Sequence, residues 1–298
     1  MAATQRALGN RCVRLIVATS ALLLLSTASN AEAPRSPSIG GELLADFKYF
    51  VDNVQLDLQD IVTSPLYIAS ENSVFRSPRF YLTLAGVGAL WGGSYALDQT
   101  LRSHLHNMSS ADADLLQNIS YGSVCGGTAL LYAYGLYSDD AQTRQDVLTG
   151  AEGAGVATLL TIGIKAAFGR LRPFQDNHSH TAWFRGGSSF VSGDVTPLFG
   201  LAAGISEAFH NEWYVAAPAY SLALLDGFGR MGHDKHWFSD VVGAGLLGWG
   251  TAELFFYLHR QHANQPSRWR IFPLEVAPSA VGRRNEVPPL GFAVAYDW

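Results

Sequence analysis

The feature that most constrains the fold is a series of long apolar segments joined by short polar ones. They span residues 80–97, 115–138, 147–168, 197–209, 213–225 and 239–259. Apolar runs of this length are typical of helices that are buried on most sides, not of strands. We therefore predict an all-α protein whose core is a six-helix bundle.

The amino-acid composition further limits the kind of protein that this chain can be. Charged residues make up only 15% of the chain, against about 25% in average soluble domains. So few charges exclude a disordered protein. The three lysines, Lys48, Lys165 and Lys235, form no basic patch, so no nucleic-acid partner is expected.

The first two apolar runs, 80–97 and 115–138, contain no charged residue and are long enough to span a bilayer. An acidic residue interrupts or ends each of the other four, namely Glu152, Glu207, Asp226 and Glu253. Their shorter uncharged stretches suit buried core helices better. The mixture predicts a helical bundle that is partly sunk in a membrane.

The N-terminus has the three-part layout of a secretory signal peptide, predicted over residues 1–31. Its apolar part, residues 15–25, would span only about 16 Å as a helix, too short for a membrane anchor. We expect export to a bacterial cell envelope. The protein would face the periplasm and be membrane-associated or integral; a soluble periplasmic protein is the alternative.

Three further segments follow. Residues 32–72 are predicted to be a linker and an amphipathic helix, which would run over 42–63, end at Ser64–Pro65 and pack on the core or lie on a membrane, the core being favoured. Residues 73–262 form the helical domain. In 263–298 apolar residues alternate with polar ones, which predicts a C-terminal tail with a β-hairpin.

Lys165 and Arg172 form the first cluster with chemical potential, at the end of the third run. Seven residues are close to two helical turns, so the two cations share one face. Pro173 directs Arg172 out of the helix. Two cations in a segment with few charges indicate an anion site, although they can also stabilise the carbonyl groups at a helix C-terminus.

The second cluster is the glycine- and serine-rich segment 186–194, just before the fourth run. Backbone N–H groups at the start of a helix can bind phosphate. Ser192 and Gly193 are the candidate ligands. The alternative is a turn in which Asp194 or Thr196 caps the next helix.

The third cluster contains Arg230, His236 and Asp240. The spacing of His236 and Asp240 places them on one helix face. A carboxylate that accepts a hydrogen bond from Nδ1 leaves Nε2 of a histidine free as a nucleophile. A capping pair at the start of the last run is the alternative.

Taken together and in this order, the clusters resemble the type 2 phosphatidic acid phosphatases. Their superfamily also includes soluble bacterial acid phosphatases and vanadium haloperoxidases. The signatures are K-x6-R-P, P-S-G-H and S-R-x5-H-x3-D. The first matches in full, and the third matches except that Gly229 replaces serine. In the second, Ser192 and Gly193 match, but Val191 replaces proline and Asp194 replaces histidine.

The resemblance covers roughly residues 73–260 and implies a phosphatase-like helical domain. It implies that Lys165, Arg172, Arg230, Ser192 and Gly193 bind the phosphoryl oxygens. His236, oriented by Asp240, would attack phosphorus to form a phosphohistidine. No metal or other cofactor is implied.

Asp194 stands where the family has the histidine that protonates the leaving group. A protonated carboxyl could do the same, with activity shifted toward acidic pH. His233, His178 and His180 are other candidate proton donors.

The function predicted is metal-independent hydrolysis of phosphate monoesters or pyrophosphates. Lipid phosphates are the favoured substrates and a small phosphate ester the alternative. Two other functions stay open. One is a catalytically degenerate envelope protein that retains an anion pocket. The other is a vanadium haloperoxidase, which the short chain and the altered second motif disfavour.

Overall fold

The computed structural model describes residues 39–68, 76–175, 180–262, 269–273 and 292–296. The predicted signal peptide and most of the linker lie outside these residues. The described part is helical apart from two short strands, which confirms the all-α class of the core. The helices are α2 (Ile39–Ile68), α3 (Pro78–Ala96), α4 (Asp98–Leu105), α5 (Ser110–Tyr137), α6 (Ala141–Phe168), α7 (Val195–Ala208), α8 (Trp213–Gly232) and α9 (Phe238–His262).

Each of the six apolar runs coincides with one of the helices α3 and α5–α9, to within seven residues at either end. The short helix α4 was not predicted from the sequence, because it is polar and only eight residues long. Local capping explains two of the starts. The side chain of Ser109 accepts a hydrogen bond from Asp112 N before α5, and that of Asp140 accepts one from Thr143 N before α6.

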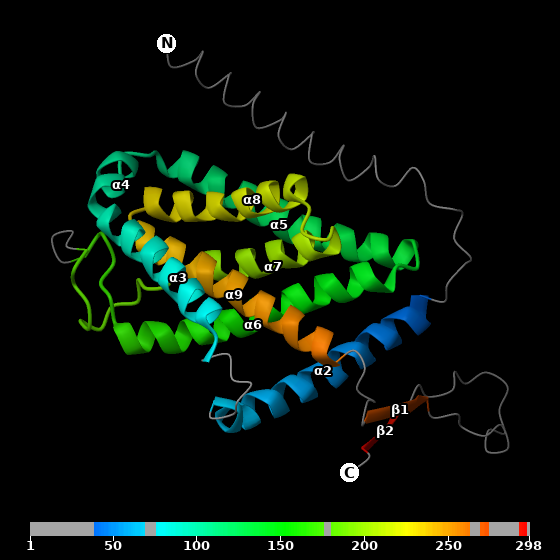
Figure 1. Ribbon diagram of the computed structural model, residues 1–298. Coiled ribbons are helices and arrows are strands. Elements are labelled where there is room, and N and C mark those ends of the chain that lie inside the picture. Colours follow the sequence, from blue (N-terminus) through cyan, green and yellow to red (C-terminus); the bar gives the residue numbers. More distant parts are fainter. Residues whose placement is uncertain (1–38, 69–75, 176–179, 263–268, 274–291, 297–298) are drawn as a thin grey trace, which may run out of the picture.

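The centre of the molecule is built by α6, α7 and α9, which lie against one another, with α5 and α8 packed beside α7 (Figure 1). Glycine allows the close approach. A Cβ atom at Gly150 would lie 2.5 Å from the Cα of Gly204, so any side chain there would push α6 away from α7. Gly153 and Gly200 allow equally close contacts with Ala252 of α9 and Ala154 of α6.

The helix α2 lies across α6 and α9 on the outside of the bundle (Figure 1). Its orientation corrects the expectation that its apolar face packs on the core. Leu43, Phe47 and Phe50 are exposed, whereas the polar residues Glu42, Asp46, Asn53 and Asp57 are buried. The periodicity of a sequence defines two faces of a helix, but it does not say which face turns inward.

The end of α2 is a second correction. The helix continues past Ser64–Pro65 to Ile68. A proline removes only its own N–H from the hydrogen-bond ladder, and Pro65 lies in the last turn, where little helix remains to be disrupted.

Two described helices, α6 and α9, are long and apolar enough to cross a membrane, by length and composition alone. This differs from the expectation for runs 80–97 and 115–138, which lie in α3 and α5. Those two runs are free of charge, but their glycine, serine and tyrosine residues lower the mean hydropathy. In α6 and α9 a few charged residues are outweighed by aliphatic ones.

The C-terminal tail contains the strands β1 (Trp269–Pro273) and β2 (Phe292–Tyr296). They pair antiparallel, with Ile271 opposite Val294. The segment that joins them, residues 274–291, lies outside the described residues.

Candidate active site

The end of α6 carries the first cluster. Lys165 lies in the last turn, and Gly169 ends the helix in the left-handed conformation, with φ of 49°. The chain therefore turns away from the helix axis before Arg170 and Arg172. Lys165 Nζ donates a hydrogen bond to the backbone oxygen of Ser188, 2.7 Å away, which joins the first cluster to the second.

The charges of the three candidate phosphate ligands act on one another. Burial lowers the pKa of Lys165 to about 8, and repulsion by Arg172 and Arg230 contributes to the decrease. Burial and the charge of Arg230 likewise lower the pKa of Arg172. Cations that repel one another in a partly buried site make the binding of an anion favourable.

The second cluster faces the same place. Ser192 is buried, and its Oγ has no hydrogen-bond partner among the described residues. A Cβ atom at Gly193 would lie 3.7 Å from Lys165 Cε, which shows how closely the segment approaches the lysine. An unpartnered buried hydroxyl beside an ammonium group is suited to a phosphoryl oxygen.

Asp194 occupies the N-cap position of α7, but its side chain makes no capping hydrogen bond. Its Oδ2 lies 3.0 Å from Arg230 Nη2 instead. The hydroxyl of Tyr121 donates to Asp194 Oδ1 at 3.5 Å and to its backbone oxygen at 3.4 Å. Asp194 therefore contacts one of the predicted phosphate ligands directly.

His236 lies in the turn before α9, whereas Asp240 lies in the first turn of the helix. The imidazole is buried, and Nδ1 lies 2.9 Å from the backbone oxygen of Ser189. Asp240 Oδ2 is 3.7 Å from Nδ1, too far for a direct hydrogen bond. Nδ1 thus faces a carbonyl acceptor with the carboxylate of Asp240 close behind it, and Nε2 has no hydrogen-bond partner among the described residues.

The surroundings of His236 favour its neutral form. Burial lowers the pKa of the imidazole, and the charges of Lys165 and Arg230 lower it further. Asp240 acts in the opposite direction. A neutral imidazole with a free Nε2 has the lone pair that a nucleophile requires.

Sequence reasoning missed the residue that holds Asp240 in place. Arg170 belongs to the first cluster, but its side chain is fully buried and pairs with Asp98 and Asp240, at 2.6 Å each. Its guanidinium also lies over the Trp183 ring, 4.4 Å from the centroid. The only signal in the sequence was one more cation in a segment with few charges.

Asp226 is the second residue that was missed as a candidate. It lies one helical turn before Arg230 in α8 and is fully buried, and neither carboxylate oxygen has a hydrogen-bond partner in the described part of the chain. Burial raises its pKa to about 7; the charge of Asp194 adds to the increase and that of Arg230 opposes it. It can therefore hold a proton at neutral pH.

The other candidate proton donors have partners of their own. His233 Nε2 lies 2.8 Å from Asp114 Oδ1. The His180 ring lies 5.0 Å from the Tyr95 ring, and the backbone oxygen of His180 accepts from Arg170 Nη2 at 2.8 Å. His178 lies outside the described residues.

An apolar cavity of about 360 Å³ adjoins the first two clusters. It is lined by aromatic residues only, namely Trp91, Phe168, Trp183, Phe184 and Phe190. Phe168 follows Lys165 by three residues, and Phe190 precedes Ser192 by two. Two of the lining residues, Phe168 and Phe190, therefore belong to the same stretches of chain as Lys165 and Ser192, while Trp91 comes from α3.

Comparison with known proteins identifies a family for part of the chain. A family model described as the PAP2 superfamily matches residues 123–263. No curated protein and no solved structure matches the chain. The matched residues include all three clusters, from Lys165 to Asp240. This part of the chain belongs to the PAP2 superfamily.

Proposed function

We propose that the protein is a phosphatase that hydrolyses lipid phosphate monoesters or pyrophosphates through a phosphohistidine, without a metal ion in the reaction. Membership of the PAP2 superfamily supports a phosphoester hydrolase. The observation that carries the mechanism is the buried His236, whose Nδ1 faces the carbonyl of Ser189 and whose Nε2 is left free among cations.

Lys165, Arg172 and Arg230 would bind the phosphoryl oxygens, helped by Ser192 Oγ and the N–H of Gly193. Their positive charge stabilises the negative charge that develops in the transition state. His236 Nε2 donates its lone pair to phosphorus while the bond from phosphorus to the leaving oxygen breaks. Water then attacks the phosphohistidine, and the electrons of the P–N bond return to Nε2.

The leaving oxygen needs a proton, and we assign it to Asp194. Without substrate, Asp194 is paired with Arg230. A bound phosphate would take over this arginine and place negative charge beside the carboxylate, and both changes favour the protonated form. Asp226, with a pKa of about 7, is a nearby carboxyl group that can supply a proton to Asp194. The second step returns the proton of the attacking water to Asp194.

A lipid substrate is supported by the apolar cavity, which has no polar lining and adjoins the cations. Large apolar side chains are also exposed outside the cavity, including Leu82, Leu130, Leu159 and Trp213. These residues lie on four different helices, and large exposed apolar side chains in such number are compatible with contact with a membrane. We therefore place the protein at a membrane of the bacterial envelope, exported by its N-terminal leader.

The test is phosphate release by the purified full chain without added metal. Phosphatidic acid, a polyprenyl pyrophosphate and a soluble monoester are compared between pH 4 and 8. We expect turnover of at least one lipid substrate, inhibition by vanadate, and slower turnover of the soluble ester. Equal turnover of lipid and soluble esters would contradict the lipid assignment, and no turnover of any of them would contradict the enzyme.

A second function is favoured by one observation. The ion pair between Asp194 and Arg230 occupies a phosphate ligand, as expected of a site that has lost catalysis and retains only a pocket for anions. Vanadate or phosphate binding without turnover would support this degenerate protein. Bromide oxidation in the presence of vanadate would instead indicate a haloperoxidase.

A further inference from the structure

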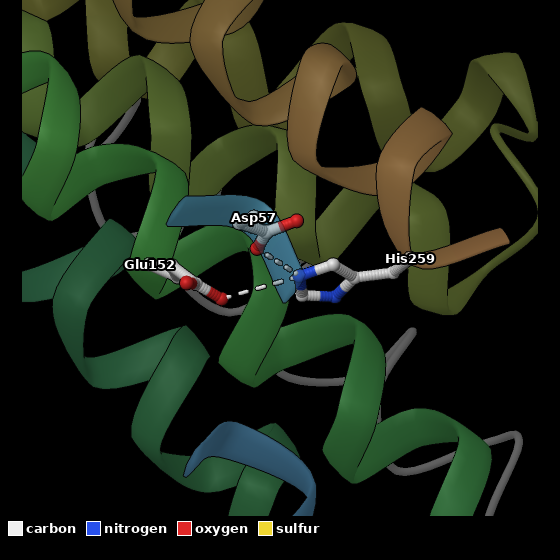
Figure 2. Close-up of side chains that lie close together, drawn as sticks. All are labelled: Asp57, Glu152 and His259. Atoms are coloured by element: carbon white, nitrogen blue, oxygen red, sulfur yellow. Dashed lines mark hydrogen bonds and ion pairs between the residues drawn. The ribbon is translucent and has the colours of Figure 1, made fainter. Parts of the chain in front are cut away.

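The end of α9 opposite the phosphatase site contains a second buried polar cluster. Asp57 from α2, Glu152 from α6 and His259 from α9 point toward one another (Figure 2). His259 Nε2 lies 2.9 Å from Asp57 Oδ2 and 3.4 Å from Glu152 Oε2. Ligands about 2.1 Å from one ion at tetrahedral angles lie about 3.4 Å apart, so the three atoms have the spacing of a metal site.

The cluster contains more carboxyl groups than imidazoles. Asp57 is only 2% exposed, and its Oδ1 has no hydrogen-bond partner in the described part of the chain. His262 Nδ1, 3.6 Å from that oxygen, has none either. His262 Nε2 lies 3.0 Å from a third carboxylate, that of Asp60. Asp60 is 42% exposed, so the buried carboxylates are those of Asp57 and Glu152. Two buried carboxylates beside one imidazole are costly unless protons or a cation compensate them.

The other nitrogen of His259 is oriented as in a metal-bound histidine. Nδ1 lies 3.0 Å from Thr149 Oγ1 and 3.0 Å from the hydroxyl of Tyr49. Thr149 Oγ1 donates its proton to the backbone oxygen of Gln145, so it can accept one from Nδ1. With the proton on Nδ1, the Nε2 lone pair faces Asp57 and Glu152 at a distance that a metal ion can bridge.

We propose that Asp57, Glu152 and His259 bind one divalent transition-metal ion, of the Zn²⁺ or Mn²⁺ class. Two carboxylates and one imidazole suit these ions, whereas Ca²⁺ takes six to eight oxygen ligands and Mg²⁺ also takes oxygen ligands. The ligands come from three helices, so the ion fastens α2 to α6 and α9. It would add to the ion pairs of Arg144 with Glu42 and Asp46, which already join the inward polar face of α2 to α6.

The site is separate from the phosphatase chemistry. His259 lies about 28 Å along α9 from Asp240, and Glu152 lies about 20 Å along α6 from Lys165, at the rise of a straight helix. An ion there cannot contact a phosphate bound by Lys165. Its role is structural, and the proposal does not depend on the proposed function.

The experiment uses the purified full chain, stripped of metal with EDTA and then dialysed. Zn²⁺, Mn²⁺, Mg²⁺ and Ca²⁺ are added singly, and bound metal and Tm are measured. We expect one equivalent of Zn²⁺ or Mn²⁺ per chain and a Tm rise of roughly 5 °C or more at saturation. Glu152→Gln should lose both effects, while the matched control Glu253→Gln on α9 keeps them.

Three results would overturn the proposal: no bound Zn²⁺ or Mn²⁺, equal binding by Glu152→Gln, or a Tm rise with Mg²⁺ or Ca²⁺ alone. A measurement on the wild-type chain guards against a variant that fails to fold. One equivalent of Co²⁺ should give the visible absorption bands of an ion bound by nitrogen and oxygen ligands. Zn²⁺ should displace the Co²⁺ and remove these bands. Absence of these bands in the folded protein also contradicts the site.

Discussion

Helix α9 has a buried histidine cluster near each of its two ends, and the two clusters have different neighbours. At one end, the charges of Lys165 and Arg230 lower the pKa of His236, against the single carboxylate of Asp240. At the other end, Asp57 and Glu152 contact His259. The same side chain therefore meets cations in one place and carboxylates in the other.

The difference shows that the neighbours of an imidazole decide its chemistry. Among cations, a neutral histidine with a free Nε2 is a nucleophile placed where an anionic substrate must bind. Among carboxylates, the same group is a ligand or a proton donor. In both clusters Nδ1 faces an oxygen that can accept its proton, the carbonyl of Ser189 or the hydroxyl of Thr149.

The largest effect is expected from His236→Ala. Loss of the nucleophile should reduce kcat by on the order of 10⁴- to 10⁶-fold, because no other described residue combines a free Nε2 with the cations. An acid-labile, alkali-stable phosphoenzyme should be trapped in the wild type and be absent from the variant. His233→Ala, whose histidine pairs with Asp114, is the control and should keep most activity. Full activity in His236→Ala would contradict the mechanism.

The next effect is that of Asp194→Asn. If Asp194 is the leaving-group acid, esters with poor leaving groups should lose about 10²- to 10⁴-fold in kcat, and activated aryl phosphates should be spared. Asp194→His restores the usual residue of the family and should move the pH optimum toward neutral. If Asp194 only occupies Arg230, Asp194→Asn should lower KM for both substrate classes and leave kcat unchanged.

Arg170→Ala should act on stability. The guanidinium is fully buried between Asp98 and Asp240, so its removal leaves two buried carboxylates without a partner. Breaking a buried ion pair from one side costs about 3–5 kcal/mol of the free energy of unfolding. Denaturant titration measures this loss. The control is Arg260→Ala, because Arg260 pairs with Glu207 at an exposed position and should lose no more than about 1 kcal/mol.

The pH profile tests the electrostatics of His236. Burial lowers the pKa of this imidazole, so it stays neutral, and nucleophilic, at pH values below its ordinary 6.5. The acid limb of kcat/KM should therefore lie below pH 6.5, with about a tenfold loss per pH unit. Asp240 raises this pKa, so Asp240→Asn should move the limb to still lower pH. The ionisation of the substrate is the same for both proteins, so the difference between them reports the enzyme.

Much of the fold and the site was predictable, because both rest on local spacing. Long apolar runs identified the helices from α3 to α9 except α4. The separations of Lys165 from Arg172 and of His236 from Asp240 placed these residues at the ends of helices. The superfamily match over residues 123–263 confirmed the resemblance. The roles of the individual site residues stay predictions.

What could not be predicted depends on contacts between distant parts of the chain. Arg170 meets Asp98 from a different helix and a different run, and no local pattern joins them. The inward polar face of α2 has the same origin. Asp57 is buried because it meets His259, which lies 202 residues later in the chain. The sequence contained no histidine–carboxylate spacing that indicated this cluster.

The smallest effect on turnover is expected from chelation. This test compares the phosphate site directly with the proposed metal site at the other end of α9. EDTA should leave kcat and KM unchanged well below Tm, because Lys165, Arg172 and Arg230 supply the charge at the phosphate. The same treatment should lower Tm, because it removes the ion that joins Asp57, Glu152 and His259. Rate and Tm are measured on one preparation, before and after chelation and after return of Zn²⁺. A rate that falls with chelation at low temperature and returns with Zn²⁺ would show that the two ends are coupled. An unchanged rate together with a reversible fall in Tm would show that one end performs the chemistry and the other holds the fold.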